Sequence, residues 1–316
     1  MTNVTNIRPS KAPNLPVAPQ QYDSTFQNQF ENILRLYFNQ IDNAIGQLAT
    51  VTASTIGSSA TNPSYTISST ETPYALPPYL QVSRGLVSGT SVVNIYGYQS
   101  ALPNSSAVTY YPVWENTTAY TYPASATTML LWSSSASDTA VQVLINGLDS
   151  SYNLLSETLT LTNGTTGVTT VNSYLRINGI QVVGTVNAVG TLNVGNAGKT
   201  IQYAEIIAGN GKSQAMIYTV PNGYTFYLTR SNAYSNQSGN TINNFCGYRV
   251  WTQSSSGLIQ ILLQAPFTNS YQTLRVAPRA YAAKTDIQWQ ATGGPSSGTS
   301  QVGIGVEGIL IANGTV

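Results

Sequence analysis

Charge is scarce in this sequence, and histidine is absent. Of the 316 residues, 12 are lysine or arginine and 11 are aspartate or glutamate, so charged residues make up 7% of the chain. An average soluble domain has about 25%. Without histidine and with one cysteine, the chain cannot form an internal disulfide, a Cys/His zinc site or a histidine-based catalytic triad. The net charge of +1 also provides no basic surface for nucleic acid. These absences favour a structural or binding protein over an enzyme, and we expect no cofactor, no metal and no nucleic-acid partner.

Long apolar runs are missing as well. No stretch of about 18 apolar residues occurs, so we expect no membrane insertion. The first 21 residues contain four prolines and lack the apolar core of a secretory signal. Because proline fixes φ and removes a backbone donor, residues 1–22 are predicted to form an extended arm.

The only strong helix signal covers residues 23–50. Apolar residues recur there in steps of three and four, which is the period of one helix face. So wide an apolar stripe on a helix with few charges indicates a surface that docks on another part of the protein or pairs with copies of itself. The residues of this predicted docking or oligomerisation stripe are Phe26, Phe30, Ile33, Leu34, Tyr37, Phe38, Ile41, Ile45 and Leu48.

After a Ser/Thr/Pro-rich linker over residues 51–84, the pattern changes to short runs of Val, Ile, Thr and Tyr between Gly, Asn, Ser and Pro turns. This pattern is typical of antiparallel β-sandwiches. We therefore predict a mainly β protein with two consecutive jelly-roll-like sandwiches, one over residues 85–211 and one over 212–316.

Two segments carry the clearest strand patterns. Residues 141–161 alternate apolar and polar on both sides of a turn, which predicts a hairpin. In the last segment, Val302, Ile304 and Val306 alternate with Gly303 and Gly305. Glycine at those two positions suggests the close approach of another backbone or of a bulky side chain.

Aromatic residues crowd the stretch from 96 to 122. They suit three roles, which the sequence leaves open: a sandwich core, a subunit interface, or a face that stacks on sugar rings. The candidate residues are Tyr96, Tyr98, Tyr110, Tyr111, Trp114 and Tyr120.

Three carboxylates, Asp138, Asp149 and Glu157, lie near the predicted hairpin. A pair held about 5–9 Å apart would suit glycoside hydrolysis. The stronger interpretation is structural, because Asp149 lies in a turn where its side chain can accept from backbone N–H groups. No catalytic residue is therefore assigned.

Several segments resemble virion structural proteins of marine and cyanobacterial tailed phages. They are APNLPVAPQQYDSTFQNQFENILRLYFNQIDNAIGQL near the start, the middle stretch with GLDSSYN, SETLTL and SYLRIN, and TVPNGYTFYLTRS with the later RVAPRAYAAKTDIQW. In that group the opening segment recurs on different virion proteins, which implies a docking module. The resemblance brings no catalytic residues with it.

Together, the residues and the resemblance predict a non-enzymatic phage virion protein: an external fibre, spike or decoration anchored to the head, neck or tail by its N-terminal arm and helix. The expected partners are other copies of the chain, as a homotrimer by analogy with fibres, and other virion proteins, and the expected location is the virion. The alternative is a fibre that binds host-surface glycans.

Overall fold

The computed structural model describes residues 25–39, 41, 77–104, 109–116, 119–237, 246–294 and 298–314. The chain divides into two compact units, residues 1–88 with 315–316, and Gly89–Gly314. The predicted arm over residues 1–22 and the linker up to residue 76 lie outside the described residues. The described part is mainly β with antiparallel pairing throughout, as the composition predicted.

Among its described residues, the first unit contains two helical segments. Residues 25–39 and 41 are helical, which confirms the N-terminal helix. A second, short helix α2 (Pro78–Ser83) corrects the expectation that linker extends to residue 84. Its proline stands in the first turn, where a missing backbone N–H costs nothing, and the Ser83 hydroxyl donates to the Tyr79 carbonyl at 2.8 Å.

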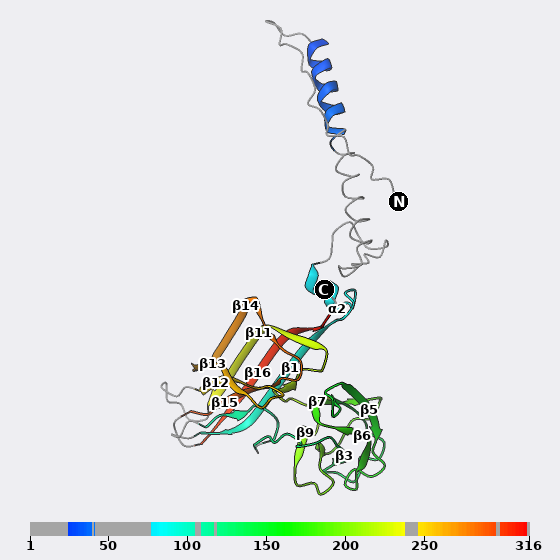
Figure 1. The fold of residues 1–316 in the computed structure, drawn as a ribbon, viewed down its shortest axis with the longest axis vertical. Helices are drawn as coiled ribbons and strands as arrows, with labels where there is room; N and C mark the ends of the chain where they lie inside the picture. The colour runs from blue at the N-terminus through cyan, green and yellow to red at the C-terminus, as the bar shows by residue number, and fades with distance from the viewer. Residues whose placement is uncertain are drawn as a thin grey trace. The chain divides into compact units, whose positions relative to one another are not determined.

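The second unit contains two sandwiches, and the larger one holds the C-terminal strands (Figure 1). One of its sheets has the strand order β1 (Thr90–Pro103), β16 (Thr299–Ala312), β11 (Tyr224–Gln237), β14 (Ser270–Tyr281). The other has the order β10 (Ile217–Thr219), β15 (Asp286–Thr292), β12 (Cys246–Gln253), β13 (Ile259–Phe267), with β2 (Tyr111–Pro112) also paired to β15. Phe226, Tyr248, Trp289 and Ile304, all fully buried, form part of one core with residues from both sheets.

The smaller sandwich lies between β2 and β10 in the sequence. Its four-stranded sheet has the order β6 (Val168–Tyr174), β3 (Thr127–Ser133), β8 (Leu192–Gly195), β9 (Gln202–Ile206), and its three-stranded sheet has the order β5 (Leu154–Thr160), β4 (Gln142–Leu148), β7 (Arg176–Val183). The predicted hairpin is confirmed, since β4 pairs with β5 and Val143 lies opposite Leu159. Both side chains belong to the core of this sandwich.

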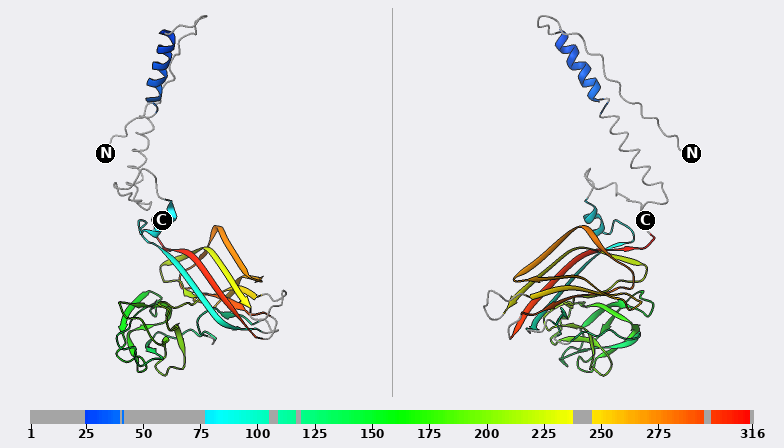
Figure 2. Two further views of the ribbon diagram at one scale, coloured as in Figure 1. Left: turned by 180° about the vertical axis from the view of Figure 1, so that it is seen from behind. Right: turned by 60° about the vertical axis from the view of Figure 1, so that its left-hand side comes forward.

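The predicted boundary near residue 212 needs one correction. Strand β1 pairs with β16 along nearly its whole length, from Thr90 opposite Ile311 to Pro103 opposite Thr299 (Figure 2). Leu102 and Val113 also belong to the core of the larger sandwich. Residues 90–113 therefore complete the C-terminal sandwich, and the smaller sandwich is inserted into it. Because β1 pairs with a strand about 200 positions away, no local sequence pattern indicates that residues 90–113 belong to the C-terminal sandwich.

Gly303 of β16 makes room for an aromatic ring, whereas a Cβ on Gly305 would meet the Asn232 side chain. A Cβ on Gly303 would lie 2.5 Å or less from three atoms of the Tyr234 side chain. Tyr96 lies opposite Gly305, and Tyr234 opposite Gly303. The missing side chain at Gly303 leaves room for the Tyr234 ring, which stacks with Tyr96 across β16 with centroids 6.3 Å apart and an interplanar angle of 26°. The predicted bulky neighbour is thus a tyrosine.

Candidate functional site

The N-terminal helix has one partly buried stripe. The remaining residues of the described helix, outside this stripe, are all exposed. Phe38, a predicted member of the stripe, is 59% exposed, and the neighbouring Leu36 is 61% exposed. Two further predicted members, Ile45 and Leu48, lie outside the described residues. The partly buried residues are Phe26, Phe30, Ile33, Leu34, Tyr37 and Ile41.

The candidate aromatics do not share one exposed face. Trp114 is 1% exposed and packs edge-on against Tyr120, with ring centroids 5.2 Å apart; Tyr120 in turn packs edge-on against Tyr122 at 5.1 Å. Burial raises the pKa of both tyrosines. These rings lie inside the protein, next to the contact between the two sandwiches.

The other four candidates separate as well. Tyr111 packs against the core of the larger sandwich. The guanidinium of Arg249 lies 4.3 Å above the ring of Tyr110, which is partly buried, as is Tyr98. Tyr96 is 41% exposed, so it is the candidate best placed to contact a partner.

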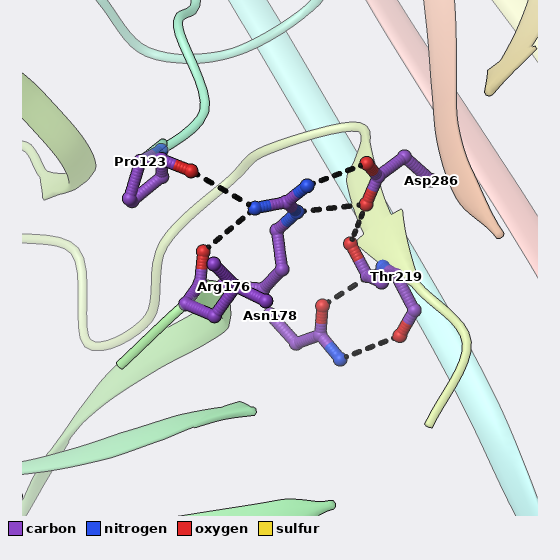
Figure 3. A network of polar contacts seen from close by, with 6 residues as sticks. Pro123, Arg176, Asn178, Thr219 and Asp286 are labelled. Carbon is purple, nitrogen blue, oxygen red and sulfur yellow. Dashed lines mark hydrogen bonds and ion pairs between the residues drawn. The ribbon is translucent and has the colours of Figure 1, made fainter. Parts of the chain in front are cut away.

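A buried ion pair joins the two sandwiches (Figure 3). Arg176 on β7 binds Asp286 on β15 through two hydrogen bonds of 2.9 Å, and a further Arg176 nitrogen donates to the carbonyls of Leu175 and Pro123. Asp286 also accepts from the Thr219 hydroxyl at 2.6 Å. Burial acts to lower the pKa of Arg176, but the hydrogen bonds and charge of Asp286 outweigh it and raise that pKa.

A second polar link runs beside the ion pair. The Asn178 amide donates to the Thr219 carbonyl and accepts from the Thr219 N–H, both at 2.9 Å. The guanidinium of Arg176 also lies 4.5 Å from the ring centre of Tyr122. Because Arg176, Asp286, Asn178 and Thr219 all have hydrogen-bond partners, the two sandwiches are held in one arrangement rather than linked loosely. We call this set of contacts the junction.

Two of the carboxylates near the hairpin stabilise loops, and the third, Glu157, links β5 to β6. Asp149 accepts from the N–H groups of Ser151 and Asn153 at 2.8 and 2.9 Å, as the turn interpretation predicted. Asp138 accepts from the N–H groups of residues 189 and 190, and Glu157 from those of 171 and 172. In the described residues, no three His, Cys, Asp or Glu side chains come together as a metal site would require.

Two other glutamates, Glu115 and Glu205, lie close to each other. Glu115 is 6% exposed and accepts from Asn210 at 3.0 Å, and Glu205 accepts from Asn116 at 3.0 Å. Burial raises the pKa of both carboxyl groups, and the charge of Glu205 adds to the shift at Glu115. Sequence analysis missed this pair because its members are 90 positions apart.

An open cleft lies between β1 and the β5–β4–β7 sheet. It consists of two adjoining cavities of about 720 and 540 Å³, which share Asn94, Gln181 and Lys212. Asn146 and Asn178 line the first cavity, and Tyr96 and Gln214 line the second. The side chains of Asn94, Asn146, Gln181 and Lys212 are exposed, and none of them makes a hydrogen bond or ion pair with the described part of the chain.

The opposite side of the larger sandwich is apolar. Strands β13 and β14 are the edge strands of its two sheets and follow each other in sequence. Leu274 is 75% exposed and Val276 is fully exposed on β14, while Ile259 and Ile261 are about half exposed on β13. Open strand edges usually carry charges that prevent association. Here the exposed side chains include these aliphatic ones, beside an exposed Arg230 that lies opposite Leu274.

No family model matches the chain, and no curated protein does. Among solved structures, it is similar to the viral particle of infectious bursal disease virus (TM-score 0.21, 10% identity, 71% of this chain and 70% of that chain). It is also similar to the Gx strain of the same virus (0.20, 9%, 71% and 71%) and to its VP2 subviral particle (0.20, 9%, 72% and 72%). At TM-scores near 0.2 these likenesses carry no conclusion about function. None of the helices among the described residues is long and apolar enough to cross a membrane.

Proposed function

We propose that this chain is a non-enzymatic structural protein of a tailed-phage virion, an external fibre, spike or decoration that assembles as a homo-oligomer, by analogy a trimer. The N-terminal arm and helix anchor it to the head, neck or tail of the particle. The β unit forms the external body.

The observation that carries the proposal is the amphipathic helix in a unit of its own. One stripe of the helix consists of Phe26, Phe30, Ile33, Tyr37 and Ile41. The helix and the sandwiches belong to different compact units of the chain. An apolar stripe of this width is stabilised by covering it, and a particle protein or neighbouring copies of the helix would do so.

The β unit supports self-association. The edge at Ile259, Ile261, Leu274 and Val276 exposes aliphatic side chains. The exposed charges beside Leu274, Arg230 and Glu307, form an ion pair of opposite sign. Low charge suits surfaces that are covered by other copies.

Incorporation into particles tests the anchoring role. A phage that encodes Phe30→Asp with Tyr37→Asp should yield particles without this chain, because two charges on the stripe oppose its burial. The matched control, Gln29→Asp with Asn32→Asp, places the same charges on exposed positions and should leave incorporation unchanged. Mass spectrometry of purified particles gives the readout. Absence of the unmodified chain from particles, or equal incorporation of both variants, contradicts the proposal.

The second candidate function is binding of host-surface glycans. Tyr96 favours it, since this exposed aromatic ring borders a cleft lined by free amide groups. The two functions are compatible in one fibre.

A further inference from the structure

We propose that the cleft between β1 and the β5–β4–β7 sheet binds an oligosaccharide, with one sugar ring stacked on Tyr96. The inference rests on the second candidate function and gives that function a site. It is independent of how the chain is anchored.

The lining of the cleft matches the chemistry of a sugar. Each hydroxyl of a sugar both donates and accepts hydrogen bonds, and an amide side chain offers two donors and an acceptor. Asn94, Asn146, Gln181 and Gln214 place four such amides along the two cavities. Ser91 and Ser156 add hydroxyl groups to the first cavity.

These polar groups are not needed by the fold. By contrast with Asn178, whose amide is occupied by Thr219, the side chains of Asn94, Asn146 and Gln181 have no partner among the described residues. The cleft lies between the two sandwiches, and its exposed polar groups are available to bind a polar ligand.

Tyr96 and Tyr234 form an aromatic platform at one end of the cleft. Tyr96 and Tyr234 are 41% and 39% exposed, and their rings stack across β16 over Gly303. A flat ring pair is rigid and amphipathic, so it can cover the apolar C–H face of a pyranose while the amides bind its hydroxyls. Because Tyr96 also lines the second cavity, the platform and the amides can contact the same ligand.

The junction holds the two walls of the cleft in place. One wall, β1, belongs to the larger sandwich, and the other, with Gln181 and Asn146, belongs to the smaller one. Asn178 lines the first cavity and bonds to Thr219 across the junction. Walls fixed in this way lose little freedom when a ligand binds, which favours affinity.

Lys212 sets a preference among sugars. It is the charged residue that lines both cavities, and its side chain is exposed. An exposed ion pair contributes little, so a carboxylated sugar should bind only a few-fold more tightly than its neutral counterpart, and this difference should shrink in salt.

A glycan array probed with the full chain tests the proposal first. The array should carry neutral hexose and N-acetylhexosamine oligomers together with oligomers that contain a uronic acid. We expect the chain to bind at least one oligosaccharide on the array. Saturation-transfer NMR with that oligosaccharide then identifies the sugar protons that contact the protein. If no oligosaccharide binds, glycan recognition fails as a function and this site fails with it.

Substitutions then locate the binding. Tyr96→Ala should weaken binding about five- to tenfold through the lost stacking. Lys212→Gln should remove the preference for the uronic acid. The matched controls are Tyr79→Ala, which removes a 70% exposed ring on α2, and Lys199→Gln, which removes an exposed charge outside the cleft. Both controls should bind as the unmodified chain does.

Because Asn94 is exposed and makes no side-chain hydrogen bond among the described residues, Asn94→Ala should leave the thermal unfolding midpoint unchanged. Tyr96→Ala loses the stack with Tyr234 and should lower the midpoint slightly, so Asn94→Ala is the second variant if Tyr96→Ala unfolds. If the chain binds a glycan that neither Tyr96→Ala nor Asn94→Ala weakens, the site is elsewhere while the function stands.

Discussion

Arg176 and Asp286 are 110 positions apart in the sequence and meet through two parallel hydrogen bonds of 2.9 Å. Their side chains are 11% and 5% exposed. Arg176 belongs to the SYLRIN segment and Asp286 to the KTDI segment, so two of the segments that carry the phage resemblance meet at the junction. A third such segment, the turn with Tyr152, also reaches the larger sandwich, where its carbonyl accepts from the Asn222 N–H at 2.7 Å.

The junction should dominate the coupling between the sandwiches. Asp286→Ala leaves the Arg176 guanidinium buried without its partner, and breaking a buried pair in this way costs about 3–5 kcal/mol. Glu307→Ala is the matched control, because it removes the exposed Arg230–Glu307 pair, in which the charged atoms are 3.7 Å apart. That change should cost at most about 1 kcal/mol. Urea unfolding measures both, and equal costs would contradict a structural role for the junction.

The Glu115–Glu205 pair should make stability fall as pH rises. Since the folded state raises the pKa of both carboxyl groups above 4.5, it binds protons more tightly than the unfolded chain does. Their contribution to the free energy of unfolding is therefore fully present below pH 4.5 and is lost as pH rises through the raised pKa values.

Glu205→Gln removes one charge and keeps an acceptor for Asn116. The variant should be more stable than the unmodified chain at pH 7 and similar at pH 4. The pKa of Glu115, followed by carboxyl-carbon NMR, should decrease but stay raised, because burial is its largest cause. Glu307→Gln, at an exposed carboxylate, should show no such pH dependence. An unchanged pKa at Glu115 would show that the two groups do not interact.

Gly303 should be intolerant of a side chain for a single reason, the Tyr234 ring. The Cβ of Gly303→Ala would lie 2.2 Å from Tyr234 Cζ, so the ring must move away and its stack with Tyr96 is lost. We expect a cost of about 1–3 kcal/mol. In a Tyr234→Ala background most of this cost should disappear, and chemical denaturation of the four chains measures the difference. A cost that persists would point to the backbone of β16 instead.

The apolar edge of the larger sandwich should promote self-association. Leu274→Lys with Val276→Lys places charges where aliphatic side chains are now exposed, and should weaken oligomers in analytical ultracentrifugation while leaving the unfolding midpoint nearly unchanged. Val171→Lys is a control at an aliphatic residue that is 86% exposed on the smaller sandwich. If both variants leave the oligomer intact, the edge is not an interface.

Local patterns in the sequence predicted the local structure well. The helix over residues 25–39, the hairpin around Asp149 and the alternation of Val302, Ile304 and Val306 each depend on neighbours within one element, and each is confirmed. Glycine at position 303 correctly indicated a bulky neighbour, because a missing side chain is itself a local signal of space taken by another group.

The remaining features depend on contacts between distant residues. Nothing near Thr90 indicates that β1 pairs with β16, and nothing near Arg176 indicates Asp286. The candidate aromatics show the same limit: tyrosine and tryptophan suit both a core and a surface, so composition could not separate buried Trp114 from exposed Tyr96.

The inserted position of the smaller sandwich has a consequence for how the chain can change. Trp114 and Ala215, at the two ends of the insert, form a β-bridge, and the Met216 N–H donates to the Val113 carbonyl at 2.8 Å. The host strands therefore close the connection by themselves, whatever lies between. Since the entropy of closing such a loop grows only slowly with its length, parts of the insert away from the junction can lengthen or shorten at little cost to the host. Arg176 must be kept, because Asp286 of the host is buried against it. Variation that alters one wall of the cleft can thus accumulate while the body that carries it keeps its fold.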